Sequence, residues 1–279
     1  APRSIIWIVS RTNWCSHPSG RMRAASTFPR SRPSNRYVAN CRTRKERRLS
    51  VAALTFRINC RPLSRGELGT LMLLMDENSF GRCQMMRNDS DGAPFGDSPY
   101  SEATLKRMIG RKSQWFLTLW GQALGSESGD SLIVDLFQRA RGLSISIRVK
   151  NPALVDRYEQ FLATALQWVG SLPDISSAIV YDSGCDVAAV HAAAGLSRPP
   201  ACFTTHLRWV HVLAPKFYSL FLSREVLLAA PWVERVEIAG GLIVMRTSEN
   251  PFEGASPATL ERLGVVTDYL LAHDRFMKD

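Results

Sequence analysis

Two histidines on one predicted strand are the first residues to consider for chemistry. His206 and His211 lie in an apolar segment, residues 202–213, whose pattern predicts a long strand. Their spacing of five residues puts them on opposite faces of a strand, so they should not share a metal ion or a proton. His206 and Arg208 share a face and could bind an anion, although such a pair is more often plain sheet surface. The sequence places no nucleophile beside either histidine, so we predict no catalytic centre and no enzyme.

Two glycine-containing segments approach known motifs but lack the residues that the chemistry requires. A nucleophile elbow holds serine at the centre of G-x-S-x-G, whereas GSESG at 125–129 has Glu127 there. The segment NDSDG at 88–92 carries carboxylates, but a calcium-binding loop would need acidic residues in place of Arg87 and Ser98. No glycine-rich nucleotide-binding motif occurs. We interpret both segments as solvated turns.

The cysteines do not predict a metal site. Zinc ligands come in pairs about two to four residues apart, because one turn of chain must present both to one ion. Cys15 and His17 form the only close pair of this kind, and the sequence offers no second pair. Scattered thiols are typical of a reducing cytoplasm. We therefore expect no metal, no cofactor and a cytoplasmic location. The cysteines are Cys15, Cys41, Cys60, Cys83, Cys185 and Cys202.

The net charge of +10 is concentrated in the first quarter of the chain. Residues 1–70 hold 15 of the 35 basic residues and two of the 25 acidic ones, a net charge of +13, which leaves −3 for residues 71–279. The basic run NCRTRKERRLS at 40–50 belongs to this quarter. Residues 1–70 are rich in arginine, serine and proline and have only a short apolar patch at 51–56. This composition predicts little buried surface.

Three interpretations of residues 1–70 remain open at this point. The segment could be a functional basic tail, an organelle transit segment, or a non-native extension with the natural start near Met72 or Met75. We prefer the third, because a nucleic-acid-binding arm usually combines lysine with aromatic residues for stacking, and both are sparse here. We thus expect a basic, disordered or non-native extension over 1–70 and a folded domain over 71–279.

The folded part has a regular pattern from Pro99 onward. We predict an α+β fold, an antiparallel sheet with helices packed on one face. Expected strands are 114–121, a hairpin formed by 131–137 and 143–150 with a longer loop, 176–182, 202–213, and a second hairpin within 232–252 that turns at Gly240–Gly241. Expected helices begin at the caps Ser101, Asn151 and Ser256, and two more fall at 186–195 and before Pro231.

The C-terminal half carries a set of segments that resembles a known family. FTTHLRWVHVL is followed by a helix and then by GGLIVMRTSENPF, a spaced Pro/Leu helix and the end of the sequence. Together with QWFLTLWG, these segments resemble the immunity protein 52 family of bacterial polymorphic toxin systems, over about residues 114–279. The resemblance implies a cytoplasmic protein that binds and blocks a cognate toxin protein. For this family the toxin is typically nuclease-like and often delivered by type VI secretion.

The expected partner surface lies around the second hairpin and the loop SENPFEG that follows it. We expect Trp232 to be a partly exposed aromatic anchor, because tryptophan is enriched at interface hot spots. Acidic residues would surround it and match a basic cleft on the toxin. The alternative function is a nucleic-acid-associated protein that uses the arginine-rich N-terminal segment. The predicted contact residues are Trp232, Glu234, Glu237, Glu249, Asn250 and Glu253.

Other partners are not expected. No apolar run reaches the length of about 18 residues that spans a bilayer, so we predict no membrane partner. Nucleic acid is not expected to be the partner of the folded domain, since that part of the chain is mildly acidic. The sequence leaves open whether copies of the chain associate with one another.

Overall fold

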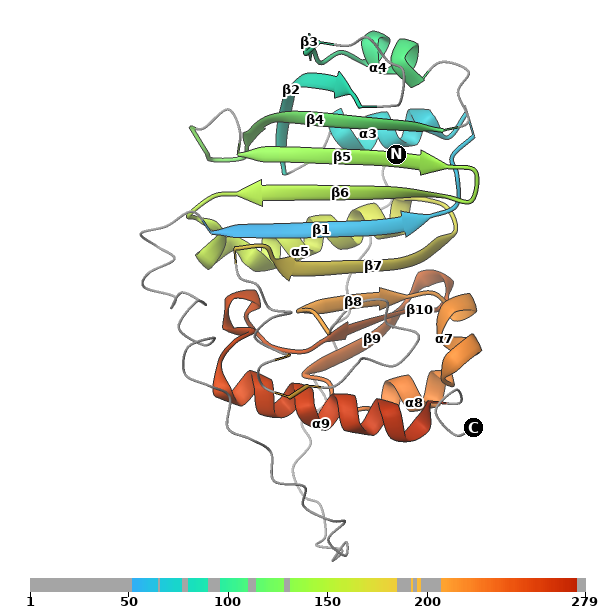
Figure 1. Cartoon of the computed structure of the whole chain (residues 1–279), viewed down its shortest axis with the longest axis vertical. Helices are drawn as coiled ribbons and strands as arrows, with labels where there is room; N and C mark the ends of the chain where they lie inside the picture. The colour runs from blue at the N-terminus through green and yellow to red at the C-terminus, as the bar shows by residue number, and fades with distance from the viewer. Residues whose placement is uncertain are drawn as a thin grey trace, which may run out of the picture. The chain divides into compact units, whose positions relative to one another are not determined.

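A computed structural model describes residues 52–64, 66–76, 80–89, 96–109, 114–127, 131–184, 192, 195–196 and 207–274. It shows the α+β fold expected, built on one ten-stranded sheet with the order β3-β2-β4-β5-β6-β1-β7-β8-β10-β9 (Figure 1). All the strand pairs described are antiparallel. None of the helices described combines the length and apolar character needed to cross a bilayer.

The strands are β1 (Ala53–Cys60), β2 (Gly81–Asn88), β3 (Ser98–Pro99), β4 (Trp115–Ala123), β5 (Leu132–Arg139), β6 (Gly142–Lys150), β7 (Ile175–Asp182), β8 (Val210–Leu213), β9 (Glu234–Ile238) and β10 (Leu242–Arg246). The helices are α3 (Leu68–Asp76), α4 (Glu102–Ile109), α5 (Leu154–Ser171), α7 (Pro215–Phe221), α8 (Arg224–Ala229) and α9 (Pro257–His273). Two short 3-10 turns, η1 (Ala239–Gly241) and η2 (Pro251–Glu253), complete the set of elements described.

Strand β1 lies in the interior of the sheet, between β6 and β7 (Figure 1). Phe56 is opposite Ile147 on one side and Val180 on the other, so both backbone edges of β1 are hydrogen-bonded. Leu54, Phe56 and Ile58 are fully buried. The predicted boundary at residue 70 is therefore wrong, because a disordered segment cannot supply a strand that is paired on both edges and packed into the core.

Residues that follow β1 also belong to the folded part. The Arg61 guanidinium binds Glu67 at the start of α3 and donates to Asp174 Oδ2 at 2.7 Å, just before β7. These contacts, with hydrogen bonds from Ser64, lower the pKa of Glu67 to about 2. A natural start at Met72 or Met75 would remove β1 and this cluster, so that interpretation does not fit the fold. Residues 1–51, which include the basic run, lie outside the described residues.

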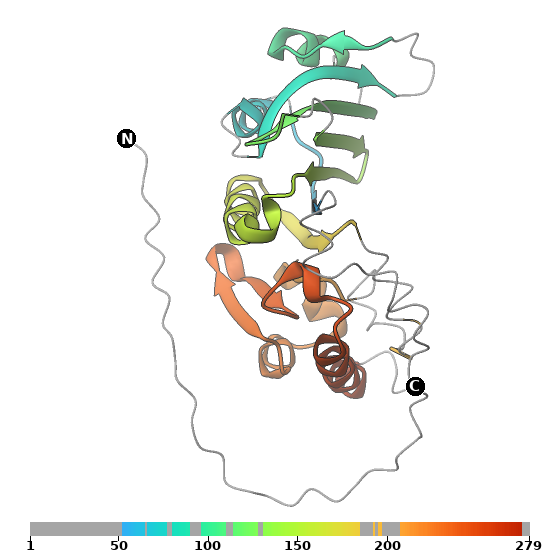
Figure 2. The ribbon, with the colours of Figure 1, turned by 90° about the vertical axis from the view of Figure 1, so that its left-hand side faces the viewer.

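One face of β2, β4, β5, β6, β1 and β7 packs on α3 and α5, which lie on the same side of the sheet (Figure 2). The strands show the expected alternation, with every second residue buried in β4, β5 and β6. The buried positions Leu117, Leu136 and Ile145 face the helices, where Phe161 and Trp168 of α5 fill the core. This is the first of two cores.

The second core lies on the opposite face of the sheet, under α8 and α9. Val212 and Val244 belong to the first core, whereas their sequence neighbours Leu213 and Ile243 contact the second. Successive residues of a strand point to opposite faces, so β8 and β10 are covered on both sides. The helices therefore pack on both faces of the sheet rather than on one as predicted.

Local signals predicted the ends of several elements correctly. The backbone N–H groups of Thr104 and Thr259 donate to the capping hydroxyls of Ser101 and Ser256 at 3.1 and 3.2 Å. The second hairpin turns at Gly240–Gly241, both with positive φ. Asn151 accepts from the Ala153 N–H at 2.9 Å, but α5 begins only at Leu154.

Other elements differ from the expectation. The turn between β5 and β6 is tight, because Arg139 already pairs with Gly142. The predicted strand 202–213 is a strand only from Val210 among the described residues, and the helix before Pro231 is divided into α7 and α8. The predicted helix at 186–195 and His206 lie largely outside the described residues.

Removal of residues 1–70 should prevent folding, because it deletes the strand that joins β6 to β7. The chain 71–279 is expected to lose the cooperative urea unfolding transition of the full chain, followed by tryptophan fluorescence. In the full chain, Ile58→Ala should lower the free energy of unfolding by about 2–5 kcal/mol. Arg57→Ala, at an exposed position of the same strand, should change it by less than about 0.5 kcal/mol. A cooperative transition in chain 71–279 would contradict this prediction.

Candidate functional site

The predicted anchor of the partner surface is not exposed. Trp232 is 5% exposed and belongs to the second core, together with Leu227 and Leu263. Its indole N–H donates to the backbone carbonyl of Leu227 at 2.7 Å, which satisfies its polar atom inside the protein. The prediction of partial exposure is wrong because α8 and α9 cover the face of the sheet on which this residue lies.

The other predicted contact residues are divided between structural and exposed positions. Asn250 is buried, and its side chain accepts from the Phe252 N–H at 2.9 Å, so it caps the 3-10 turn η2. Glu237 pairs with Arg224. Glu249 and Glu253 are exposed and form no side-chain ion pair among the residues described. The structure therefore brings only part of the predicted acidic rim together on the surface.

Arg246 organises the surface around Glu234. Its guanidinium donates to Glu234 of β9 at 2.9 Å, to Glu159 of α5 at 2.7 Å and to the backbone carbonyl of Glu249 at 2.8 Å. It also lies over the Trp209 ring, 5.4 Å from its centroid. The Arg246 side chain is only 14% exposed. Because one side chain connects α5, β9 and the loop after β10, we interpret this cluster as structural.

His211 is a buried, neutral residue of β8. Its Nε2 accepts from the backbone N–H of Arg208 at 2.6 Å. Burial, assisted by the positive charge of Arg208, lowers the pKa of His211 from 6.5 to about 3. This accepting role and low pKa indicate that His211 stabilises the fold. Our sequence-based prediction of no catalytic role for His211 remains untested.

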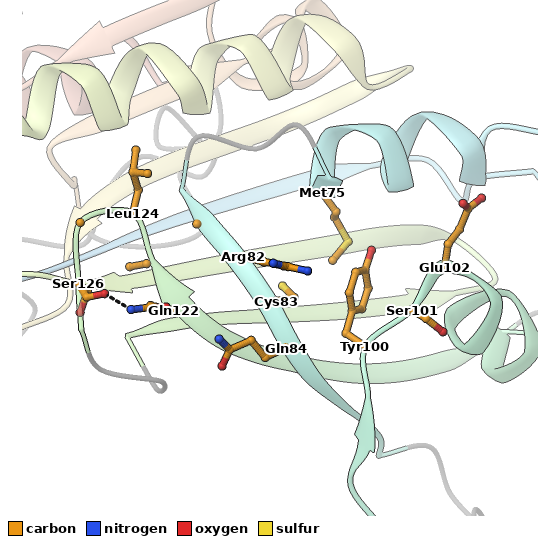
Figure 3. Close-up of a pocket in the computed structure, with 13 residues that line it drawn as sticks. Met75, Arg82, Cys83, Gln84, Tyr100, Ser101, Glu102, Gln122, Leu124 and Ser126 are labelled. Atoms are coloured by element: carbon orange, nitrogen blue, oxygen red, sulfur yellow. Dashed lines mark hydrogen bonds between the residues drawn. The ribbon is translucent and has the colours of Figure 1, made fainter.

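An open hollow of about 920 Å³ lies where β2 crosses the end of β4 (Figure 3). Figure 3 shows Tyr100 and Glu102 on one side of it and Leu124 on the other. The strands approach closely here, since a Cβ atom on Gly121 would lie 2.1 Å from the Arg82 carbonyl. The Glu102 carboxylate is paired with Lys106 within α4. The lining residues thus include no convergent charged pair.

The most distinctive surface is the face of β2, β4, β5, β6, β1 and β7 that lies opposite α3 and α5. We call it the open face. Hydrogen-bonded neighbours point to the same side, so the strand register orders its residues in rows. One row runs Arg87, Thr118, Asp135, Ser146 and Arg57 across β2, β4, β5, β6 and β1. A neighbouring row runs Trp120, Ile133, Arg148, Thr55 and Tyr181, of which Thr55 is fully buried.

Arginines and aromatic rings are paired on the open face. The Arg139 guanidinium lies 4.5 Å from the centroid of the Phe137 ring, and Arg87 lies 5.8 Å from that of Trp120. Tyr181 is covered in the same way by Arg208, at 5.0 Å. Arginine and aromatic residues are the types enriched at the cores of protein interfaces.

The charge on the open face is mostly positive. Arg57, Arg139 and Arg148 are exposed and make no ion pair among the residues described, whereas Arg87 binds Asp89. The acidic residue in the rows is Asp135, which accepts from the Thr118 hydroxyl at 3.1 Å. Sequence reasoning missed this face. The alternation of Ser144, Ser146 and Arg148 in β6 did signal a half-exposed strand, but not that five neighbouring strands share the surface.

The residues described contain no group of three or more His, Cys, Asp or Glu side chains that could hold a metal ion. Cys60 and Cys83 are buried, and burial raises the pKa of the Cys60 thiol to about 11. The four other cysteines lie outside the described residues. Comparison of the chain with protein-family models, curated proteins and solved structures found no match.

The low pKa of His211 predicts a loss of stability in mild acid. Between pH 6.5 and about 3 the unfolded state binds a proton that folded His211 does not. The protein should therefore lose stability as the pH falls, by about 1.4 kcal/mol per pH unit below 6.5 from this residue. Urea unfolding at pH 7.5 and pH 5 should show a decrease larger by about 2 kcal/mol in the wild type than in His211→Gln. Equal decreases in both proteins would exclude this role.

Replacing Arg246 should lower the free energy of unfolding more than replacing an arginine whose ion pair is exposed. Arg246→Met removes the contacts with Glu159, Glu234 and the Glu249 carbonyl, and should lower the free energy of unfolding by about 1–2 kcal/mol. Arg224→Met, which breaks the exposed pair with Glu237, is the matched control and should have a clearly smaller effect. Thermal and urea unfolding measure both. An equal loss in the two variants would show that the cluster around Arg246 contributes no special stability.

Proposed function

We propose that the chain is an immunity-type protein, which binds a cognate bacterial toxin and neutralises it by occlusion rather than by catalysis. The observation that carries the proposal is the open face, a wide sheet surface that α3 and α5 leave uncovered and that presents paired arginines and aromatic rings. A toxin inhibitor of this kind needs a broad contact surface, because the affinity of protein pairs comes from a few well-packed anchors within such a surface.

The resemblance to the immunity protein 52 family supports the same conclusion. The segment QWFLTLWG, one of those that carry the resemblance, forms most of β4. Phe116 and Trp120 of this strand point to the open face, while Trp115 and Leu117 are buried in the first core. The toxin is proposed to be nuclease-like and associated with type VI secretion, as the resemblance implies, and the complex is proposed to form in the cytoplasm.

A nucleic-acid-associated function is the second candidate. It is favoured by the basic character of the open face, where Arg57, Arg139 and Arg148 are exposed. The arginine-rich run at 40–50, on which this candidate first rested, lies outside the described residues. Binding of this kind would weaken steeply with salt, because it releases the counterions of the phosphate backbone.

Co-expression with a toxin tests the proposed function. The full chain should restore growth to bacteria that produce the toxin encoded by the gene beside its own, and should form a complex with that toxin on size-exclusion chromatography. An unrelated immunity protein, expressed to the same level, should give no protection. Unchanged killing in the presence of soluble, folded chain would refute the immunity function.

A further inference from the structure

We propose that the open face binds a carboxylate-rich surface of the partner protein. This inference rests on the proposed function, in that the partner is the toxin, and it replaces the predicted acidic contact surface with a basic one. Its exposed cations are Arg57 and Arg148 on the neighbouring strands β1 and β6, and Arg139 where β5 meets the turn into β6. The partner is thus expected to present aspartate and glutamate side chains, interleaved with apolar ones.

The exposed charges of the open face are unbalanced. Arg57, Arg139 and Arg148 are exposed and make no ion pair among the described residues, and Lys150 adds a fourth cation at the end of β6. Asp135 is the acidic residue in the same rows, and the Thr118 hydroxyl already donates to it. A face with this imbalance attracts partners of the opposite charge and repels those with a basic surface.

Aromatic rings preorganise the arginines of the open face. Stacking on an aromatic ring holds the flat guanidinium group in one orientation and leaves its N–H groups directed along its edges. Arg139 is held in this way by Phe137, and Phe116 packs edge-on against the same ring at 5.6 Å. A fixed guanidinium fork binds a carboxylate through two parallel hydrogen bonds and loses little side-chain entropy on binding.

The size of the open face suits a protein partner. Six strands about 4.8 Å apart and about eight residues long give a surface of roughly 750 Å². A stable complex of standard size buries about 800 Å² on each partner. The open face therefore supplies most of one such interface, with the contribution of neighbouring loops making up the rest.

The ring arrangement favours a protein over single-stranded nucleic acid. Nucleic-acid-binding sheets present free aromatic faces on which bases stack. Here Phe137, Trp120 and Tyr181 each have a guanidinium group over the ring. Base stacking would have to displace these arginines, whereas a carboxylate can bind them where they lie.

The test uses the full chain and a fluorescein-labelled twelve-residue peptide of alternating aspartate and valine as the probe. Fluorescence anisotropy should show binding that depends on the open face. The double variant Arg139→Gln, Arg148→Gln should raise the Kd by about tenfold or more, since each arginine contributes charge-assisted hydrogen bonds. A peptide with lysine in place of aspartate should bind at least about tenfold more weakly to the wild type.

The matched control is the double variant Arg235→Gln, Arg262→Gln. These arginines are exposed on β9 and α9, away from the open face, and make no ion pair among the residues described. The control removes the same charge from the chain, so any effect of net charge or of the basic N-terminal segment is common to both variants. It should change the Kd by less than about twofold. Equal urea midpoints would establish that both variants are folded.

Two results would overturn the inference. One is an equal loss of peptide binding in the two double variants, which would indicate attraction by net charge alone. The other is a tenfold loss of binding to a twelve-nucleotide thymidine strand in Arg139→Gln, Arg148→Gln with the peptide Kd unchanged, which would assign the face to nucleic acid.

The co-expression assay separates this inference from the proposed function. If the wild type protects and Arg139→Gln, Arg148→Gln protects equally well, the immunity function stands and the open face is not the docking surface. If peptide binding depends on the two arginines but the wild type gives no protection, the acidic-partner surface stands and the immunity function fails.

Discussion

The structure depends on two strands that are buried on both faces. Val210 and Val212 of β8 complete the core under α5, and Leu213 completes the core under α8 and α9. Strand β10 repeats this arrangement, with Val244 facing one core and Ile243 and Met245 the other. Because both faces of these strands are covered, few polar side chains occur in them, and Arg246 at the end of β10 reaches the surface with 14% of its side chain exposed. His211 of β8 is polar but buried, so it has to be neutral and hydrogen-bonded.

The change of covered face at β8 also explains why the open face exists. Helices α3 and α5 lie on one side of the sheet, and α8 and α9 cover the opposite side at β8 and β10. The other side of β2, β4, β5, β6, β1 and β7 has no helix packed on it in the described part of the chain. Most of its residues are half-exposed or exposed, and an arginine lies over each of the rings of Phe137 and Trp120.

The features that the sequence predicted are those decided by neighbouring residues. Ser101 and Ser256 cap helices because a serine hydroxyl reaches an N–H three residues on, and Gly240–Gly241 turns because few other residues tolerate positive φ. Strand β1 was not predicted, although Leu54, Phe56 and Ile58 alternate with polar residues as in a strand. The basic composition of residues 1–70 as a whole indicated disorder, and this strand pattern covers only eight of those residues. The burial of Trp232 and the open face follow from which helix covers which face, a property of distant contacts that no local spacing encodes.

Strand β1 can pair with its neighbours in the sheet only after much of the chain has been synthesised. β1 leaves the ribosome first of the described strands, yet its partners β6 and β7 begin at Gly142 and Ile175. At about 5–20 residues per second, the apolar strand waits several seconds before either edge can be paired. During that interval Leu54, Phe56 and Ile58 lack the two strands that pair with β1 in the folded protein. Of the strands described, β1 therefore waits longest for its partners in the sheet.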